Sequence, residues 1–163
     1  MIFLIGSQVS IYVLAFLIGV VAGLRSMTAP AVVSWGARLG WLHLENTSLA
    51  FLGAPVTPYI LSLLAIGELI ADKLPNTPSR KAPVGFTARV VTGALCGGAL
   101  GAPSQALVGG LMAGVIGAVG GTLGGYEARS RLVRAIGGKD FPIALIEDAV
   151  AIGGAIWIVS RFS

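Results

Sequence analysis

Five long apolar segments constrain this chain more than any other feature of its sequence. A helix needs about 20 apolar residues, within a range of ~17–25, to cross the ~30 Å hydrocarbon core of a bilayer. The segments that meet or approach this length are 2–24, 58–74, 86–102, 104–124 and 141–160. The second and third are short, so they require tilt or local thinning of the bilayer. We predict an all-α polytopic membrane bundle with about five spans.

Charged residues are too few for a domain surrounded by water. Only 11% of the 163 residues are charged and 55% are hydrophobic, whereas a soluble domain carries roughly 25% charged residues. The length fits one domain, so we expect a single transmembrane domain over 1–163, with repeat halves at 1–103 and 104–163. No Lys or Arg precedes the first apolar segment, which favours a retained helix over a cleaved signal peptide.

The basic residues predict an orientation. With five spans, the side that holds the N-terminus also receives Lys73, Arg80, Lys81, Arg89, Arg129, Arg131, Arg134 and Lys139. The other side receives only Arg25, Arg38 and Arg161. Positively charged loops stay in the cytoplasm, so the N-terminus is predicted to be cytoplasmic. The connection between the first two spans, 25–57, mixes tryptophans with polar residues and predicts an interfacial helix.

Glycines recur every four residues in two of the predicted spans. They are Gly93, Gly97 and Gly101 in the third span, and Gly110, Gly114, Gly117, Gly121 and Gly125 in the fourth. Such a stripe lets two helix backbones approach closely where no hydrophobic effect operates between helices. The stripes could meet within one chain or between two copies, so a homodimer is one expectation.

Two pairs of segments resemble each other and predict an internal inverted repeat. Residues 19–40 and 117–138 each leave a glycine-rich helix, pass a charged kink and continue as an amphipathic stretch that ends in Gly. Residues 63–71 resemble 142–151. The pairing joins span one with four and span two with five, and an odd offset inverts one copy. Transporter sites lie near the midplane at the interface of such repeats.

Acidic residues inside the apolar segments form the candidate site. An ionised carboxylate near the bilayer centre costs ~2.5–3.5 kcal/mol on insertion scales, so such groups face the protein interior and mark pathways. Helix rise places Glu68 and Glu147 in the middle of the protein, approached from opposite sides. The predicted ion- or substrate-binding residues are Arg25, Ser26, Thr28, Glu68, Asp72, Glu127, Glu147 and Asp148.

Arg25, Ser26 and Thr28 enter this set because the first helix is predicted to break there. Pro30 and Gly23 favour an interruption, and unwound backbone at membrane depth is tolerated where it is buried in protein or lines a cavity. A structural alternative is an ion-pair cluster, in which Arg25 pairs with Glu147 or Glu68 and fastens helices without transport. Arg25 could instead reach toward the membrane surface.

A second group of basic residues is predicted to contact lipid headgroups or an anion. These residues are Arg80, Lys81, Arg129, Arg131 and Arg134, and each Lys or Arg near anionic headgroups contributes about 1 kcal/mol. The single Cys96 excludes a multi-cysteine metal site. We expect no cofactor and no nucleic-acid partner, and the sequence leaves the identity of any metal open.

The chain resembles a family of small bacterial membrane proteins. The runs that carry the resemblance are "GLRSMTAPAVVSW", "ELIADKLPNTPSR", "ARVVTGALCGG", "GGYEARSRLVRAIG" and "IALIEDAVAIGG". The family is domain of unknown function 4126, and the similarity covers nearly the whole chain. It implies a bacterial inner-membrane protein with several helices, and it implies no activity, substrate or cofactor.

Three functions are compatible with these patterns. The first is a small transporter or channel, in which the carboxylates bind a cation or proton while a small polar solute or ion crosses. The second is a non-catalytic scaffold or assembly protein that packs through its glycine zippers. The third is a lipid-headgroup enzyme with Glu68 and Asp72 on a metal ion, although three or more oxygen ligands are usual for such an ion. We expect the first, and no catalysis.

Overall fold

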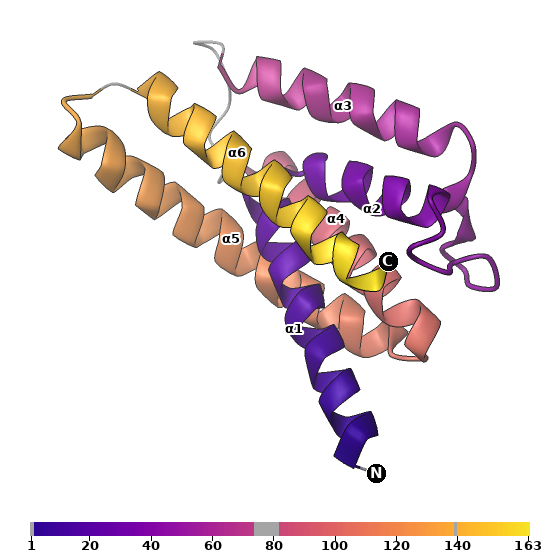
Figure 1. The fold of residues 1–163 in the computed structure, drawn as a ribbon. Helices are drawn as coiled ribbons and strands as arrows, with labels where there is room; N and C mark the ends of the chain where they lie inside the picture. The colour runs from indigo at the N-terminus through magenta and orange to yellow at the C-terminus, as the bar shows by residue number, and fades with distance from the viewer. Residues whose placement is uncertain (1, 74–81, 139) are drawn as a thin grey trace.

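The computed structural model describes residues 2–73, 82–138 and 140–163, with side chains from residue 8 onwards, and it is helical throughout that part (Figure 1). The α-helices are α1 (Ile2–Leu24), α2 (Thr28–Arg38), α3 (Thr57–Ala71), α4 (Pro83–Gly101), α5 (Leu107–Ala135) and α6 (Asp140–Val159). Short 3-10 turns lie at η1 (Ala50–Gly53), η2 (Ala102–Ser104) and η3 (Ser160–Phe162). The predicted all-α bundle is confirmed.

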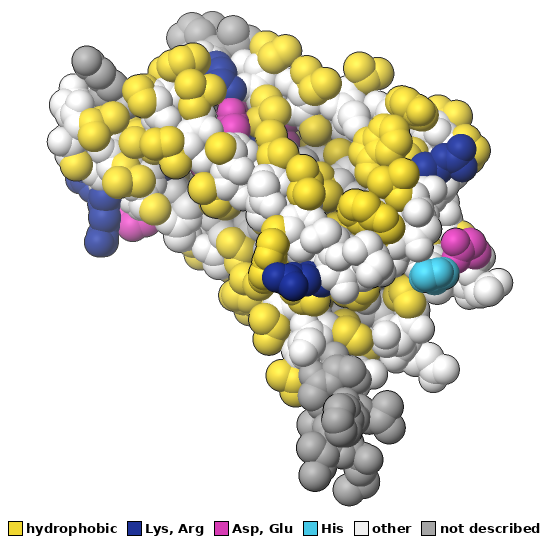
Figure 2. Space-filling view, in the orientation of Figure 1, with side chains coloured by type: hydrophobic (Ala, Val, Ile, Leu, Met, Phe, Trp, Pro, Cys, Tyr) yellow, Lys and Arg dark blue, Asp and Glu magenta, His cyan; other side chains and the backbone are white. Residues whose placement is uncertain are grey.

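Several of these helices are long and apolar enough to cross a membrane. Three stretches meet both criteria, namely Pro83–Ser104, Leu107–Ala135 and Asp140–Phe162, and Gln8–Leu24 and Thr57–Ala71 are shorter apolar helices. Figure 2 shows apolar side chains across most of one face, with charged side chains confined to a few places. Leu63 and Val108 are 71% and 72% exposed. An exterior of this kind suits lipid rather than water, so the chain is a membrane protein.

Helices α1, α4 and α5 form the closely packed centre of the bundle. A Cβ on Gly97 would overlap the carbonyl oxygen of Gly110, and a Cβ on Gly117 would overlap that of Phe16. The glycine stripe of α5 therefore lets both α4 and α1 approach backbone to backbone. Because these contacts lie within one chain, the stripes no longer point to a second copy.

The contacts also fix the direction of each helix. Gln8 of α1 donates a hydrogen bond to the carbonyl of Ser104, just before α5, and Thr122 of α5 donates one to the carbonyl of Gly23. Helices α1 and α5 therefore run parallel. Helix α4 is antiparallel to α5, because Gly93 lies against Gly114 while Gly101 lies against the carbonyl of Ala106.

The remaining helices complete an alternating pattern. Ser26, just before α2, contacts Glu68 near the end of α3, so these two helices are antiparallel. Helix α6 begins where α5 ends, since Arg129 binds Asp140. Helices α1, α3 and α5 thus run one way, and α2, α4 and α6 run the other (Figure 1). We call the place where α1, α3 and α5 finish the basic end, because Lys73, Arg129, Arg131 and Arg134 lie there.

The connection predicted to hold a helix between the first two spans contains α2. Eight of its eleven residues are buried, and it packs on α3 and α6. Its length of about 16 Å is roughly half a span. It runs back along the protein, so it adds one reversal of direction that a count of five spans omits.

The added reversal overturns the predicted inverted repeat and changes which residues share an end with the N-terminus. Helices α1 and α5, which contain the matched segments 19–40 and 117–138, are parallel rather than inverted, whereas α3 and α6 are antiparallel, so one inversion does not relate both pairs. The charged kink expected in the second copy is also absent, because α5 is continuous through Ala135. Finally, α1 begins at the end of the molecule opposite the basic end (Figure 1), not beside it.

The glycine contacts predict opposite outcomes for two alanine substitutions in α5. Gly117→Ala should destabilise the protein by about 1–3 kcal/mol, because the added methyl group forces α1 and α5 apart. Gly120→Ala meets no atom within 4 Å, so it should be neutral or stabilise by roughly 0.5–1 kcal/mol through lower backbone entropy in the unfolded chain. Unfolding midpoints in detergent, followed by circular dichroism, would test this. Equal midpoints would contradict the close approach.

Candidate functional site

The site is built around the break between α1 and α2, residues 25–27. Pro30 lies in the first turn of α2, where its missing N–H costs nothing, but it could not have continued α1 because it cannot donate a hydrogen bond to a preceding carbonyl. The backbone N–H of Arg25 still bonds to Val21. The chain then turns within three residues and begins α2.

Glu68 of α3 binds the start of α2. Its Oε1 accepts hydrogen bonds from the backbone N–H and the hydroxyl of Ser26, both at 2.8 Å, and its Oε2 accepts one from the N–H of Met27 at 2.7 Å. N–H groups at a helix start have no partner within the helix, and the helix dipole there favours an anion. A carboxylate from another helix therefore supplies the cap that α2 does not make with its own side chains.

Arg25 lies beside this cap and is completely buried. Its Nη1 forms an ion pair with Asp72 of α3, and its Nη2 lies 2.6 Å from Oδ1 of Asp148 of α6. Asp148 is shared, because its Oδ2 accepts a hydrogen bond from Lys73 Nζ at 2.7 Å. We call Arg25, Asp72, Lys73 and Asp148 the charge network.

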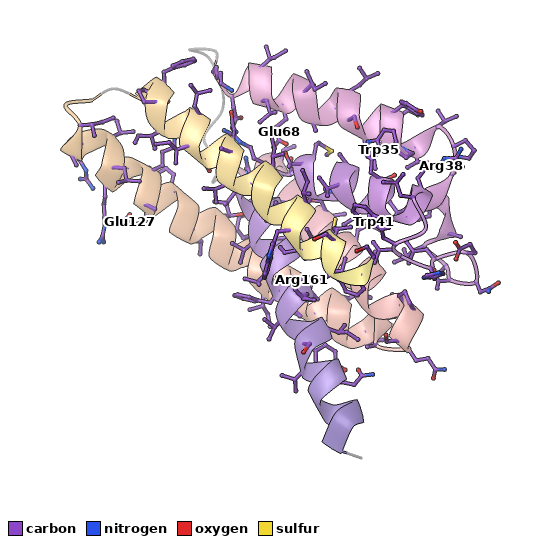
Figure 3. The ribbon with its side chains drawn as sticks, viewed as in Figure 1. Trp35, Arg38, Trp41, Glu68, Glu127 and Arg161 are labelled. Carbon is purple, nitrogen blue, oxygen red and sulfur yellow. The ribbon has the colours of Figure 1, made fainter. Side chains whose placement is uncertain are left out.

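The charge network is neutral, with two cations and two anions. If one of the two carboxylates were removed, the buried guanidinium would carry an uncompensated charge. Such a change typically costs 3–5 kcal/mol. The network thus ties together three parts of the chain that are distant in sequence: the break, the end of α3 and the middle of α6. Figure 3 shows where Glu68 lies on α3.

The charge network lies between the basic end and the middle of the bundle. Thr122 of α5 is level with Gly23, and Arg129 follows seven residues later, about 10 Å further along a helix. Asp148 comes eight residues after Asp140, which is about 12 Å into α6 by the same rise. The expectation of acids at the midplane is therefore only partly matched, because the site is nearer one side.

The predicted acids are divided between separate places. Asp72 and Asp148 meet on Arg25, and Glu68 is next to them in the cap. Glu147 instead binds Nη1 of Arg129 at 3.2 Å, and Arg129 also binds Asp140 at 2.6 Å. Contrary to the ion-pair alternative drawn from the sequence, neither Glu147 nor Glu68 is a partner of Arg25.

Other predicted residues lie away from the network or outside the described residues. Glu127 is exposed on α5 and pairs with Arg131 at 2.8 Å (Figure 3). Thr28 is buried at the start of α2, and its hydroxyl has no hydrogen-bond partner among the described residues. Arg134 donates to the carbonyl of Ser130. Arg80 and Lys81, with Lys139, fall outside the part of the chain that the structure describes.

The surroundings of two buried or partly buried cations, Lys73 and Arg89, were not predicted from the sequence. The sequence predicted only that Lys73 and Arg89 lie on the side with most of the basic residues. Lys73 binds Asp148, and Arg89 is 5% exposed in α4. Sequence spacing gave no signal for either, because their surroundings come from helices far away in sequence. Among the described residues, no three His, Cys, Asp or Glu side chains gather as a metal ion would require.

The fold and the buried charges define an all-α polytopic membrane protein with a helix broken next to an ion-pair network. The chain belongs to the family described as Domain of unknown function (DUF4126), which matches residues 12–160. Comparison with curated proteins and with solved structures finds no match.

The cap predicts a specific difference between two glutamates. Glu68→Ala removes the acceptor of two backbone N–H groups and one hydroxyl, and each buried donor left without a partner costs about 1–3 kcal/mol. Glu127→Ala removes an exposed pair with Arg131 one turn away, and such a pair is worth ~0.5 kcal/mol or less. Thermal unfolding in detergent should therefore show a clearly lower midpoint for Glu68→Ala alone. Similar midpoints for both variants would show that the cap contributes no stability.

Proposed function

We propose that this protein moves a small ion or polar solute across the membrane, with Asp72 and Asp148 as carboxylates that bind a proton or cation in exchange for Arg25. The observation that carries the proposal is the completely buried Arg25, which is shared by carboxylates from two different helices at a break in a third. Ionisable groups within membrane helices generally belong to ion or substrate pathways.

The surroundings of α3 support an exchange of partners. This helix packs mainly on α2 and η1, and its outer residues Leu63, Ile66 and Ile70 are exposed. Its C-terminal end is held to the rest of the protein by Glu68, Asp72 and Lys73. If a proton or cation neutralises Asp72, the attraction to Arg25 is lost and that end of α3 keeps only the contacts of Glu68 and Lys73.

Asp148 connects this movement to α6. It holds Arg25 on one oxygen and Lys73 on the other, so neutralising it would loosen both α1 and α3. Two carboxylates thus neighbour one guanidinium, and one stays beside it when the other is occupied by a proton or cation. This arrangement allows a charge to be passed between helices without leaving Arg25 unpaired.

Asp72→Asn and Asp148→Asn should each lower proton or Na⁺ uptake by at least about tenfold, equivalent to ~1.4 kcal/mol in the barrier. An amide has the shape of the carboxylate but neither binds nor releases a proton. Uptake would be measured in proteoliposomes with an internal pH- or Na⁺-sensitive dye, with Glu127→Gln as the charge-matched control. Undiminished uptake by folded Asn variants would refute the assignment.

A scaffold role is the second candidate, because every member of the charge network is already paired and α1, α4 and α5 pack closely. In that case the wild-type protein takes up no more proton or Na⁺ than empty liposomes. The same Asn variants would then lower only the unfolding midpoint. The uptake of the wild type therefore decides between the two functions.

We further propose that the basic end is cytoplasmic, in the inner membrane of a bacterium. Lys73, Arg129, Arg131 and Arg134 lie at that end, while Arg38 and Arg161 lie toward the other (Figure 3), which matches the enrichment of basic residues on the cytoplasmic side. The N-terminus would then face outward, opposite to the orientation predicted from five spans.

Single cysteines would test this orientation in intact cells. In a Cys96→Ala background, Ser48→Cys in the connection between α2 and α3 should react with a membrane-impermeant maleimide. Arg131→Cys, at a position 72% exposed at the basic end, should react only after permeabilisation. The reverse pattern of labelling would place the basic end outside.

A further inference from the structure

Glu45 differs from the other acidic side chains because it has no hydrogen-bond or ion-pair partner among the described residues. The other six each have a partner in a hydrogen bond or ion pair, and they are Glu68, Asp72, Glu127, Asp140, Glu147 and Asp148. Glu45 has none among the described residues and is exposed. It follows α2, at the end of the molecule opposite the basic end.

Glu45 lines a cavity of about 220 Å³ beside the C-terminal end of α2. The other lining residues are small or apolar: Ala37, Leu42, Leu44, Ala50, Gly53 and Ala54. Leu42 and Leu44 are 1% and 2% exposed, so their backbone is anchored in the core. The cavity walls are therefore held by packed residues, while the single ionisable group is free to meet a ligand.

We propose that this cavity binds a small organic cation, an ammonium group on a compact apolar body. Ligand sites combine apolar side chains with a few placed polar groups that fix orientation, and here one carboxylate stands among small and apolar side chains. An ammonium donates charge-assisted hydrogen bonds to a carboxylate, and the compact apolar body would lie against Ala50 and Ala54, because Leu42 and Leu44 are almost completely buried. An anion would be repelled by Glu45.

The proposal does not depend on the proposed function. Helix α2 separates the cavity from the charge network, since Thr28 begins it beside Arg25 and Ala37 near its other end lines the cavity. No member of the network contributes to the cavity, so binding can be measured at equilibrium in variants whose network is intact.

The test uses the whole protein in detergent and cyclohexylmethylammonium as the probe, measured by isothermal titration calorimetry against protein-free micelles. The wild type should bind this cation, and should bind the neutral cyclohexylmethanol at least about tenfold more weakly, since the loss of one charged contact of ~1.5 kcal/mol has that effect. Glu45→Gln should weaken the ammonium by a similar factor, and Glu127→Gln should leave it unchanged.

A second variant tests the cavity itself. Ala54→Leu places a larger side chain in the lining and should abolish binding, whereas Glu45→Gln leaves the volume intact. Equal affinity of Glu45→Gln and the wild type would overturn the proposal, as would unaltered binding by folded Ala54→Leu. Absence of binding by the wild type at millimolar probe would also overturn it.

Discussion

A guanidinium buried in a membrane protein must be neutralised. Much of this structure follows from the way in which the charge of Arg25 is neutralised. Moving an isolated charge into a medium of low polarity is prohibitive, so helices α3 and α6 each bring a carboxylate to the break after α1. Lys73 balances the second carboxylate, and Glu68 completes the start of α2. These contacts hold α3 at its C-terminal end, although few apolar contacts hold it elsewhere.

The rest of the bundle is stabilised in a different way. Between α1, α4 and α5, glycines such as Gly97 and Gly117 let the backbones meet, and dispersion acts along the helices. A rigid three-helix centre thus stands beside a less tightly packed pair, α2 and α3, that is joined to it by charges. Because α3 is the less tightly packed helix, a movement of α3 is the simplest conformational change for this fold.

The sequence predicted the elements of this structure better than their arrangement. Apolar runs located the long helices, and Pro30 with Gly23 located the break, because both depend on local chemistry. The direction of the chain after the break could not be predicted, because only tertiary contacts show that α2 is buried against α3 and α6. The predicted inverted repeat was wrong, because it depended on that direction.

The sequence by itself determined that the chain is helical, lies in a membrane and carries ionisable groups where lipid would exclude them, since composition and periodicity encode these properties locally. Tertiary structure alone decided which charges meet. Asp148 and not its neighbour Glu147 reaches Arg25, although the two are adjacent, because successive residues of a helix point about 100° apart and only packing selects which one faces inward. The same packing leaves Glu45 without a partner among the residues that the structure describes.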